Sequence, residues 1–156
     1  MARHPMDPEM VTAGCGDGYV RLWDLRSPTS THAVLSLSGF QGPVSGVDYF
    51  PSGMALAACG EDSTVRMFDV RTCGAVGMYA DEQLQCGATG VSFSKSGSLL
   101  FASYESGMVV CWEPLSADGF LHELKGHDET VSCLAVNPEG QALATGGWDA
   151  KICLWA

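Results

Sequence analysis

The feature that most constrains this chain is an aromatic residue, usually followed by an acid, that returns every 43 to 45 residues. It occurs as Trp23-Asp24, Phe68-Asp69, Trp112-Glu113 and finally Trp155. A repeat of that length with an aromatic-acid signature is typical of one blade of a β-propeller. Because a single blade cannot bury its own faces, the repeats must stack, and function is expected on the assembled surface.

Alternation of small polar and apolar residues predicts short strands in each repeat, separated by turns rich in Gly, Pro, Asp and Ser. We predict innermost strands at 44–50, 89–93 and 131–136, second strands at 10–14, 55–59, 99–103 and 142–146, third strands at 64–68, 108–112 and 151–155, and outermost strands at 33–37, 75–79 and 120–124. Helical periodicity is absent over any useful length of the sequence. The expected fold is all-β, with antiparallel four-stranded blades.

The number of repeats predicts an incomplete propeller. The 156 residues hold three full repeats and part of a fourth, whereas closed propellers have about four to eight blades. Residues 1–9 are predicted to be a disordered segment, which leaves the first blade without an innermost strand. Residues 10–156 are predicted to be the repeat domain, with repeats ending near 24, 69, 113 and 156. The last blade also lacks an outermost strand, so the chain is expected to be a fragment or to close with a partner.

Charge argues against nucleic acid as a partner. The net charge of −10 comes from 18 acidic and 8 basic side chains, and no Lys/Arg cluster could neutralise phosphates. An acidic body favours basic or amphipathic protein partners, and anionic lipid repels it, so membrane attachment is expected only through another subunit. The sequence contains no apolar run long enough to span a membrane. The first ten residues also lack the apolar core of a signal peptide.

Seven cysteines are spread over the repeats with no pair at metal-ligand spacing. Their odd number and the missing secretion signal favour small buried hydrophobes in a reducing cytosol over disulfides or a metal site. The Gly-rich stretch 14–18 joins two predicted strands rather than opening a helix, so it does not qualify as a phosphate-binding loop. We therefore expect no cofactor and no metal.

Several short stretches are more specific than the period itself. They are Gly-Val-Ser-Phe-Ser-Lys-Ser-Gly at 90–97, Gly-His-Asp at 126–128 with Val-Ser-Cys-Leu at 131–134, Ala-Thr-Gly-Gly-Trp-Asp at 144–149, and Asp-Val-Arg at 69–71 with Asp-Leu-Arg at 24–26. On these residues the chain resembles the WD-repeat family, and more narrowly the C-terminal half of the beta subunit of heterotrimeric G proteins. The resemblance covers the chain from about Pro8.

The resemblance implies a non-catalytic scaffold that pairs with a small gamma subunit and sequesters the GDP-bound alpha subunit. After nucleotide exchange the same rim would be exposed to effectors. It also implies a cytoplasmic protein that lies at the inner face of the plasma membrane when in complex. The family's gamma subunit docks largely against an N-terminal helix and blade surfaces, and that helix is absent from this sequence. A WD-repeat adaptor outside G-protein signalling is the alternative.

The resemblance also assigns a structural tetrad to the last repeat, in which a His, a hydroxyl residue, an Asp and a Trp share hydrogen bonds. Its members are His127, Thr145, Asp149 and Trp155. An enzyme that uses His127 and Asp149 is a second alternative, because a His, hydroxyl and Asp trio can be catalytic. The other repeats favour the structural role, since Phe40 replaces the His of the second repeat, Asp81 falls near it in the third, and Ala13, Ala58 and Ala102 replace the hydroxyl residue. The second and third repeats are therefore predicted to be the less rigid blades.

A partner-binding rim is predicted from the residues that stand just before each turn Asp or Ser, which are Gly16, Glu61, Glu105 and Trp148. Strand alternation sends these turns to one rim. By resemblance, the last three lie on the face that meets the alpha subunit and effectors, and Trp148 is the leading hot-spot candidate. The competing interpretations are a Trp folded onto its own blade and two merely solvated carboxylates.

Residues at the start of the innermost strands are expected on the same rim, because those strands begin there. They are Ser45, Thr130 and Ser132. Pro43 departs from the polar residue that the resemblance leads us to expect, so that part of the contact with the alpha subunit is not supported by the sequence.

Overall fold

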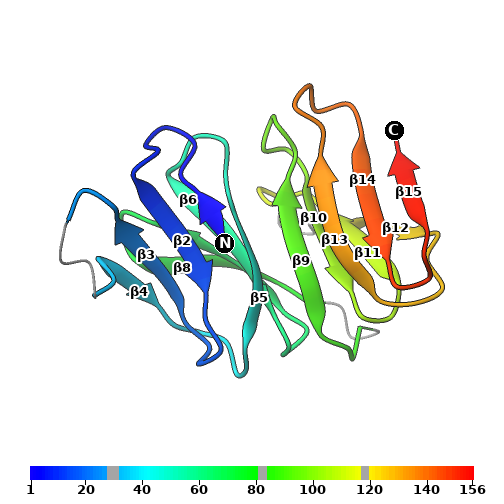
Figure 1. The fold of residues 1–156 in the computed structure, drawn as a ribbon, viewed down its shortest axis with the longest axis horizontal. Helices are drawn as coiled ribbons and strands as arrows, with labels where there is room; N and C mark the ends of the chain where they lie inside the picture. Colours follow the sequence, from blue (N-terminus) through cyan, green and yellow to red (C-terminus); the bar gives the residue numbers. More distant parts are fainter. Residues whose placement is uncertain (28–31, 81–83, 117–119) are drawn as a thin grey trace.

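The computed structural model describes residues 1–27, 32–80, 84–116 and 120–156 and arranges them as four antiparallel sheets (Figure 1). Blade 1 consists of β1 (Ala2–Arg3), β2 (Met10–Gly14), β3 (Val20–Asp24) and β4 (Leu35–Leu37). Blade 2 consists of β5 (Val44–Tyr49), β6 (Ala55–Gly60), β7 (Val65–Asp69) and β8 (Gly74–Tyr79). Blade 3 consists of β9 (Ala88–Phe93), β10 (Leu100–Tyr104), β11 (Met108–Trp112) and β12 (Phe120–Lys125). Blade 4 has three strands, β13 (Val131–Val136), β14 (Leu143–Gly147) and β15 (Ile152–Trp155).

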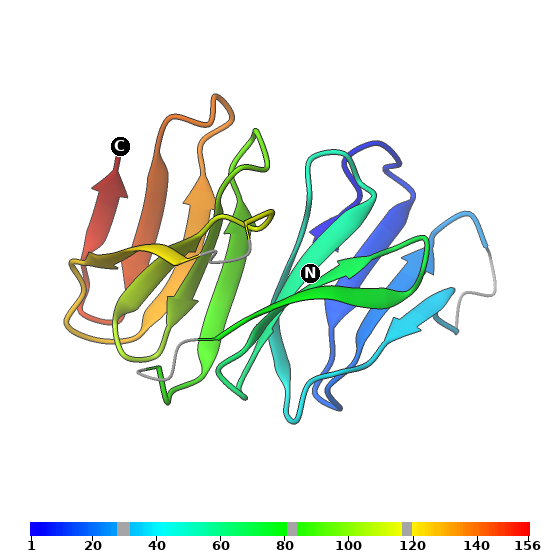
Figure 2. The same ribbon diagram turned by 180° about the vertical axis from the view of Figure 1, so that it is seen from behind.

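The blades stack face to face in chain order. Their innermost strands lie side by side, because β1 contacts β5, β5 contacts β9, and β9 contacts β13. Seen from behind, β8 (green) and β12 (yellow) lie toward the viewer, on the side away from these innermost strands (Figure 2). The arrangement is an open fan of four blades, which confirms the predicted all-β, incomplete propeller.

Among the described residues, the hydrophobic core lies between the sheets as three separate clusters. Leu22 of blade 1 packs with Leu56 and Phe68 of blade 2. The opposite face of blade 2 packs through Met67 on Trp112 of blade 3. The last interface is smaller, with Val109 of blade 3 against Val131 and Leu143 of blade 4. Each fully buried aliphatic side chain contributes about 1.5–3 kcal/mol, so contact between blades is a main source of stability.

The turns between the second and third strands share one backbone conformation. Gly18, Ser63, Gly107 and Ala150 occupy the same position and have φ angles of 82°, 65°, 84° and 57°. Glycine adopts this left-handed region freely, whereas a residue with a Cβ is strained there by about 1–2 kcal/mol. Blades 2 and 4 therefore hold their turns against local strain.

The structure differs from the sequence-based expectation at residues 1–9. Ala2 and Arg3 pair with Thr12 and Val11, so β1 fills the innermost place of blade 1 that was expected to be empty. The imidazole of His4 holds this segment: its Nδ1 accepts the N–H groups of residues 6 and 7, and its Nε2 donates to the carbonyl of Gly53. A two-residue strand has no alternation to detect, which is why the sequence did not reveal it.

Candidate protein-binding surface

The rim residues before each turn have equivalent positions in consecutive blades. Each donates its N–H to the carbonyl of the residue just before the innermost strand of its own blade: Glu61 to Pro43 (3.0 Å), Glu105 to Gly87 (3.1 Å) and Trp148 to Thr130 (2.9 Å). These turns lie on the lower edge of the view in Figure 1, where β14 leads into β15. The structure therefore brings Glu61, Glu105 and Trp148 to one rim, as the sequence predicts.

The side chains of these three residues point into solvent. Trp148 is 72% exposed, so it does not fold back onto its own blade. Glu61 and Glu105 are also exposed. Because the backbone of each residue is anchored by the hydrogen bond above, the indole and the two carboxylates are presented to solvent on a rigid frame.

Two of the other predicted rim residues, Ser45 and Ser132, owe their positions to β-bulges. The pairing of β5 with β6 omits one residue between Val44 and Gly46, and the pairing of β13 with β14 omits one residue between Val131 and Cys133. A bulge places one extra residue in the strand, and here that residue is the exposed Ser45 or Ser132. The Ser132 hydroxyl donates to the carbonyl of Gly146 at 3.2 Å.

Thr130 and Thr89 tie blades 3 and 4 together beneath the rim. The Thr130 hydroxyl donates to the carbonyl of Glu105 at 3.0 Å. Thr89 occupies the bulge of β9, is half-buried, and donates its hydroxyl to the carbonyl of Val131 at 2.6 Å. Sequence reasoning missed Thr89 as a rim residue, although it aligns with Ser45 and Ser132 and could have been found by that alignment.

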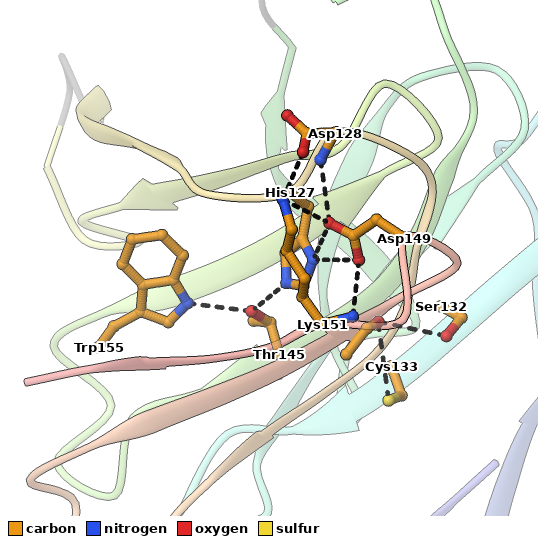
Figure 3. A network of polar contacts seen from close by, with 9 residues as sticks. His127, Asp128, Ser132, Cys133, Thr145, Asp149, Lys151 and Trp155 are labelled. Atoms are coloured by element: carbon orange, nitrogen blue, oxygen red, sulfur yellow. Dashed lines mark hydrogen bonds and ion pairs between the residues drawn. The ribbon is translucent and has the colours of Figure 1, made fainter.

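The residues of the structural tetrad form a continuous chain of hydrogen bonds below this rim (Figure 3). The indole N–H of Trp155 donates to Oγ1 of Thr145 at 3.0 Å, and Thr145 donates to Nε2 of His127 at 2.9 Å. The Nδ1–H of His127 then donates to the carboxylate of Asp149, at 3.0 and 3.1 Å from its two oxygens. This sequence of donors assigns the Nδ1–H tautomer to His127.

Asp149 is the electrostatic centre of the network. Burial of the carboxylate acts to raise the pKa of Asp149, but hydrogen bonds from His127 and from the N–H groups of Asp128 and Lys151 outweigh it and lower the pKa to about 2. Lys151 also pairs with Asp128 at the solvent edge. Asp149 is therefore ionised throughout the physiological pH range. Its hydrogen bonds from His127 and Asp128 connect the loop at 126–128 to the turn between β14 and β15.

Blade 2 fills the same place with apolar side chains. Phe40 replaces the imidazole and packs against Phe68 with 6.3 Å between ring centroids, while the guanidinium of Arg66 lies 5.2 Å from the centroid of Phe40. Blade 2 keeps the Asp of the turn: the carboxylate of Asp62 accepts the N–H of Gln41 at 3.0 Å. The loop-to-turn hydrogen bond therefore survives without the histidine.

In blade 3, Leu84 takes the position of His127, four residues before the innermost strand. It is 4% exposed and belongs to a cluster with Tyr104 and Trp112. Asp81, which the sequence placed near this position, lies outside the described residues. The residue of the third repeat that is equivalent to His127 is therefore Leu84, three residues after Asp81, which the sequence analysis placed near this position.

The trio of His127, Thr145 and Asp149 has little access to solvent. The side chain of His127 is fully buried and that of Asp149 is 5% exposed. Trp155 and Leu143 line a cavity of about 230 Å³ between blades 3 and 4, but none of the trio lines it. In the described ranges, no group of three or more His, Cys, Asp or Glu side chains is placed to hold a metal ion. The same part of the chain contains no helix long and apolar enough to cross a membrane.

Comparison with known proteins agrees with this architecture. A family model described as "WD domain, G-beta repeat" matches residues 2–24, 31–69 and 119–156. The chain is 36% identical over 156 residues to a guanine nucleotide-binding protein subunit beta of Oryza sativa subsp. indica, which covers 94% of this chain and 40% of the rice protein. It is 34% identical to subunit beta-1 of Nicotiana tabacum and 33% identical to the Arabidopsis thaliana subunit beta, each over 96% of this chain and 41% of the relative. The chain spans about 40% of the length of these relatives. On this match and this similarity, the chain belongs to the WD-domain, G-beta-repeat family.

Proposed function

We propose that this chain is a non-catalytic scaffold of heterotrimeric G-protein signalling. As part of a beta-gamma dimer, it binds the alpha subunit through the rim and presents the same rim to effectors after nucleotide exchange. The observation that carries the proposal is the row of exposed side chains at equivalent rim positions, Glu61, Glu105 and Trp148. The similarity to beta subunits over nearly the whole chain supports it.

The buried network supports a structural rather than a catalytic role. Both ring nitrogens of His127 are occupied, one by Asp149 and one by Thr145. A general base must reach the proton that it removes from a substrate, and the carboxylate of Asp149 is already held by three N–H donors. Regulation would then come from competition between partners for one surface.

Trp148 is proposed as the central contact of that surface. Tryptophan is enriched among interface hot spots, where truncation to alanine costs about 2 kcal/mol or more. Its backbone N–H is bound to Thr130, and Thr130 is bound in turn to blade 3. The indole is therefore presented on a support that spans two blades. Glu61 and Glu105 would add electrostatic selection for a basic patch.

A second surface suits the gamma subunit. Val76 and Met78 on β8 and Leu115 beyond β11 are 59%, 62% and 79% exposed and line a hollow of about 530 Å³. One wall is held by the hydroxyl of Tyr79, which donates to the carbonyl of Pro114 at 2.6 Å. Exposed apolar patches of this kind mark sites where a partner binds. Through gamma and alpha, the acidic chain would reach the inner face of the plasma membrane without touching lipid itself.

The test is capture of a purified alpha subunit by this chain together with a gamma subunit. We expect binding to the GDP-bound alpha subunit to exceed binding to the form loaded with a non-hydrolysable GTP analogue. Trp148→Ala should weaken the GDP-state complex about 30-fold, the equivalent of 2 kcal/mol. Leu25→Ala, which trims a half-exposed side chain outside the rim, is the matched control and should leave affinity unchanged.

Two results would refute the proposal: no capture of the alpha subunit, or capture that is indifferent to both nucleotide and Trp148→Ala. Either would favour a WD-repeat adaptor outside G-protein signalling. Val76→Asp separates the two surfaces, since it should reduce retention of gamma while the rim residues stay intact.

A further inference from the structure

The hydroxyl of Thr130 reaches from blade 4 to blade 3 at the rim. It donates to the carbonyl of Glu105 at 3.0 Å, and the carbonyl of the same Thr130 accepts the N–H of Trp148 at 2.9 Å. One half-buried residue thus holds the backbone of two of the three proposed contact residues, on two different blades. Both bonds are made by backbone groups of the contact residues, so they fix the position of each residue while its side chain stays exposed.

The turn of blade 3 also packs closely on the loop at 126–130, which carries Thr130. Gly107 in this turn has a φ of 84°, and a Cβ there would lie 2.7 Å from the carbonyl oxygen of His127 and 3.0 Å from that of Glu129. Only a glycine allows the loop to come so near. Just beneath, the hydroxyl of Thr89 on β9 donates to the carbonyl of the first residue of β13 at 2.6 Å. Blades 3 and 4 are therefore joined tightly at the rim.

The boundary between blades 2 and 3 is built differently at the rim. Gly87, which has no hydroxyl, stands at the position of Thr130. Ser63 stands at the position of Gly107, and its Cβ fills the space that a glycine leaves open. Within the described ranges, Asp48 joins these two blades near the far end of β5, where it accepts the hydroxyl of a serine on β9 at 3.0 Å. The rim of blade 2 is thus not linked to blade 3 in the way that blade 3 is linked to blade 4.

We propose that Thr130 is a positioning residue that makes Glu105 and Trp148 one binding unit, while Glu61 contributes on its own. The inference rests on the proposed function, because it concerns the same rim. A partner that binds Trp148 also holds the loop of Thr130, and through it the backbone of Glu105. The affinity gained at one of these two residues then depends on the other.

This unit defines the chemistry of a partner more narrowly than the rim as a whole. A partner must offer an apolar side chain to the indole of Trp148 and a basic side chain to the carboxylate of Glu105, at the separation that Thr130 sets. Contact residues that share no link normally contribute additively. Additivity is therefore expected of Glu61 with Trp148.

Amide hydrogen exchange on the 156-residue chain without a partner tests the positioning. Thr130→Val keeps the shape of the side chain and removes the hydroxyl. It should speed exchange of the N–H groups of Trp148 and Glu105 about five-fold, as expected for the loss of one hydrogen bond. Thr130→Ser keeps the donor and should exchange like wild type. Ser132→Ala is the matched control, because that hydroxyl bonds within blade 4, to β14, and its removal should leave Glu105 unchanged.

A double-mutant cycle on the complex with gamma and the GDP-bound alpha subunit tests the coupling. The combined loss of affinity in Glu105→Ala with Trp148→Ala should differ from the product of the single losses by about three-fold or more. The losses in Glu61→Ala and Trp148→Ala should simply multiply. In the Thr130→Val background the first pair should multiply as well, and in Thr130→Ser the coupling should return.

Unchanged exchange at Trp148 and Glu105 in folded Thr130→Val would overturn the proposal, whether or not an alpha subunit binds. So would coupling that persists in Thr130→Val, or simple multiplication of the losses in Glu105→Ala and Trp148→Ala. If the alpha subunit is not captured at all, the proposed function fails and the exchange rates alone decide the role of Thr130. Circular dichroism establishes that each variant is folded, and Thr130→Ala replaces Thr130→Val if the latter is not.

Discussion

At the scale of single residues, one position in the blade is filled in three ways. Blade 4 places His127 there, blade 2 places Phe40, and blade 3 places Leu84. A buried imidazole requires a partner for each nitrogen, so Thr145 and Asp149 must accompany it. An aromatic or aliphatic side chain has no such requirement, which is why the hydroxyl residue is replaced by Ala58 or Ala102 in those blades.

The depressed pKa of Asp149 predicts an acid-sensitive component of stability. Its carboxyl has a pKa of about 2 in the folded chain against an ordinary value of 3.8. Its contribution is therefore fully present above about pH 4 and is lost as the pH falls toward 2. We expect Asp149→Asn to unfold at lower urea concentration at neutral pH and to lose less stability than wild type between pH 4 and 2. Asp128→Asn, which also removes a carboxylate near Lys151, is the control and should keep the wild-type acid profile.

The strained turn of blade 4 offers a stabilising substitution. Ala150 has a φ of 57°, where Gly18 and Gly107 stand in blades 1 and 3. Ala150→Gly should relieve about 1–2 kcal/mol of strain and lose about 0.4–1 kcal/mol through the greater freedom of glycine in the unfolded chain. A net gain of about 0.5–1 kcal/mol is expected from urea unfolding. Gly107→Ala is the converse control and should destabilise, because its Cβ would lie 2.7 Å from the carbonyl oxygen of His127. If Ala150→Gly were less stable than wild type, the claim that the turn of blade 4 is strained would be wrong.

At the scale of strands and blades, burial on both faces matters more than the tetrad. β5 and β9 are flanked by blades on either side, whereas β13 exposes Ser132, Cys133 and Ala135. The absence of the tetrad from blades 2 and 3 led to the expectation that they are less rigid. Packing between the blades of this chain predicts the opposite order of rigidity, with blades 2 and 3 more rigid than blade 4.

Amide hydrogen exchange on this chain distinguishes the two predicted orders of blade rigidity. We expect slower exchange in β5 and β9 than in β13, because opening an interior blade breaks two clusters of buried side chains and opening blade 4 breaks only one. Protection of β13 equal to or greater than that of β5 would show that the tetrad outweighs packing.

Most strands could be predicted from the sequence because alternation and turn residues are local properties. The predicted bounds of β2, β11 and β13 match those of the structure, and the other predicted strands differ by one or two residues at one or both ends. Features that depend on contacts between residues distant in the sequence could not be predicted. β1 depends on His4 reaching the carbonyl of Gly53, 49 positions away in the chain, and the replacement of His127 by Leu84 follows from the register of a whole blade.

The rim could be located from the sequence because it rests on counting back from each aromatic residue. The count placed Glu61, Glu105 and Trp148 at equivalent turns, and the structure shows their matching backbone hydrogen bonds. What the count could not show was exposure, since a side chain beside a turn can point either way. Only the structure shows that the side chain of Trp148 is 72% exposed.

At the scale of the whole molecule, the four blades of the described residues meet at three interfaces that are built in the same way. In each, an aliphatic residue of the second strand is paired across the ladder with the aromatic residue of the third strand: Leu56 with Phe68, Leu100 with Trp112, and Leu143 with Trp155. One contact between neighbouring blades, used three times, thus turns a repeat of 43 to 45 residues into a continuous stack.

Of the four tryptophans in the chain, Trp148 and Trp112 lie in the most different surroundings. Trp148 stands in water, whereas Trp112 is 3% exposed between blades 2 and 3. Their emission is therefore expected at different wavelengths, long for the hydrated indole and short for the enclosed one. Binding of a partner on the rim is expected to shift the contribution of Trp148, and separation of blades 2 and 3 the contribution of Trp112, each measured on top of the emission of the half-buried Trp23 and Trp155.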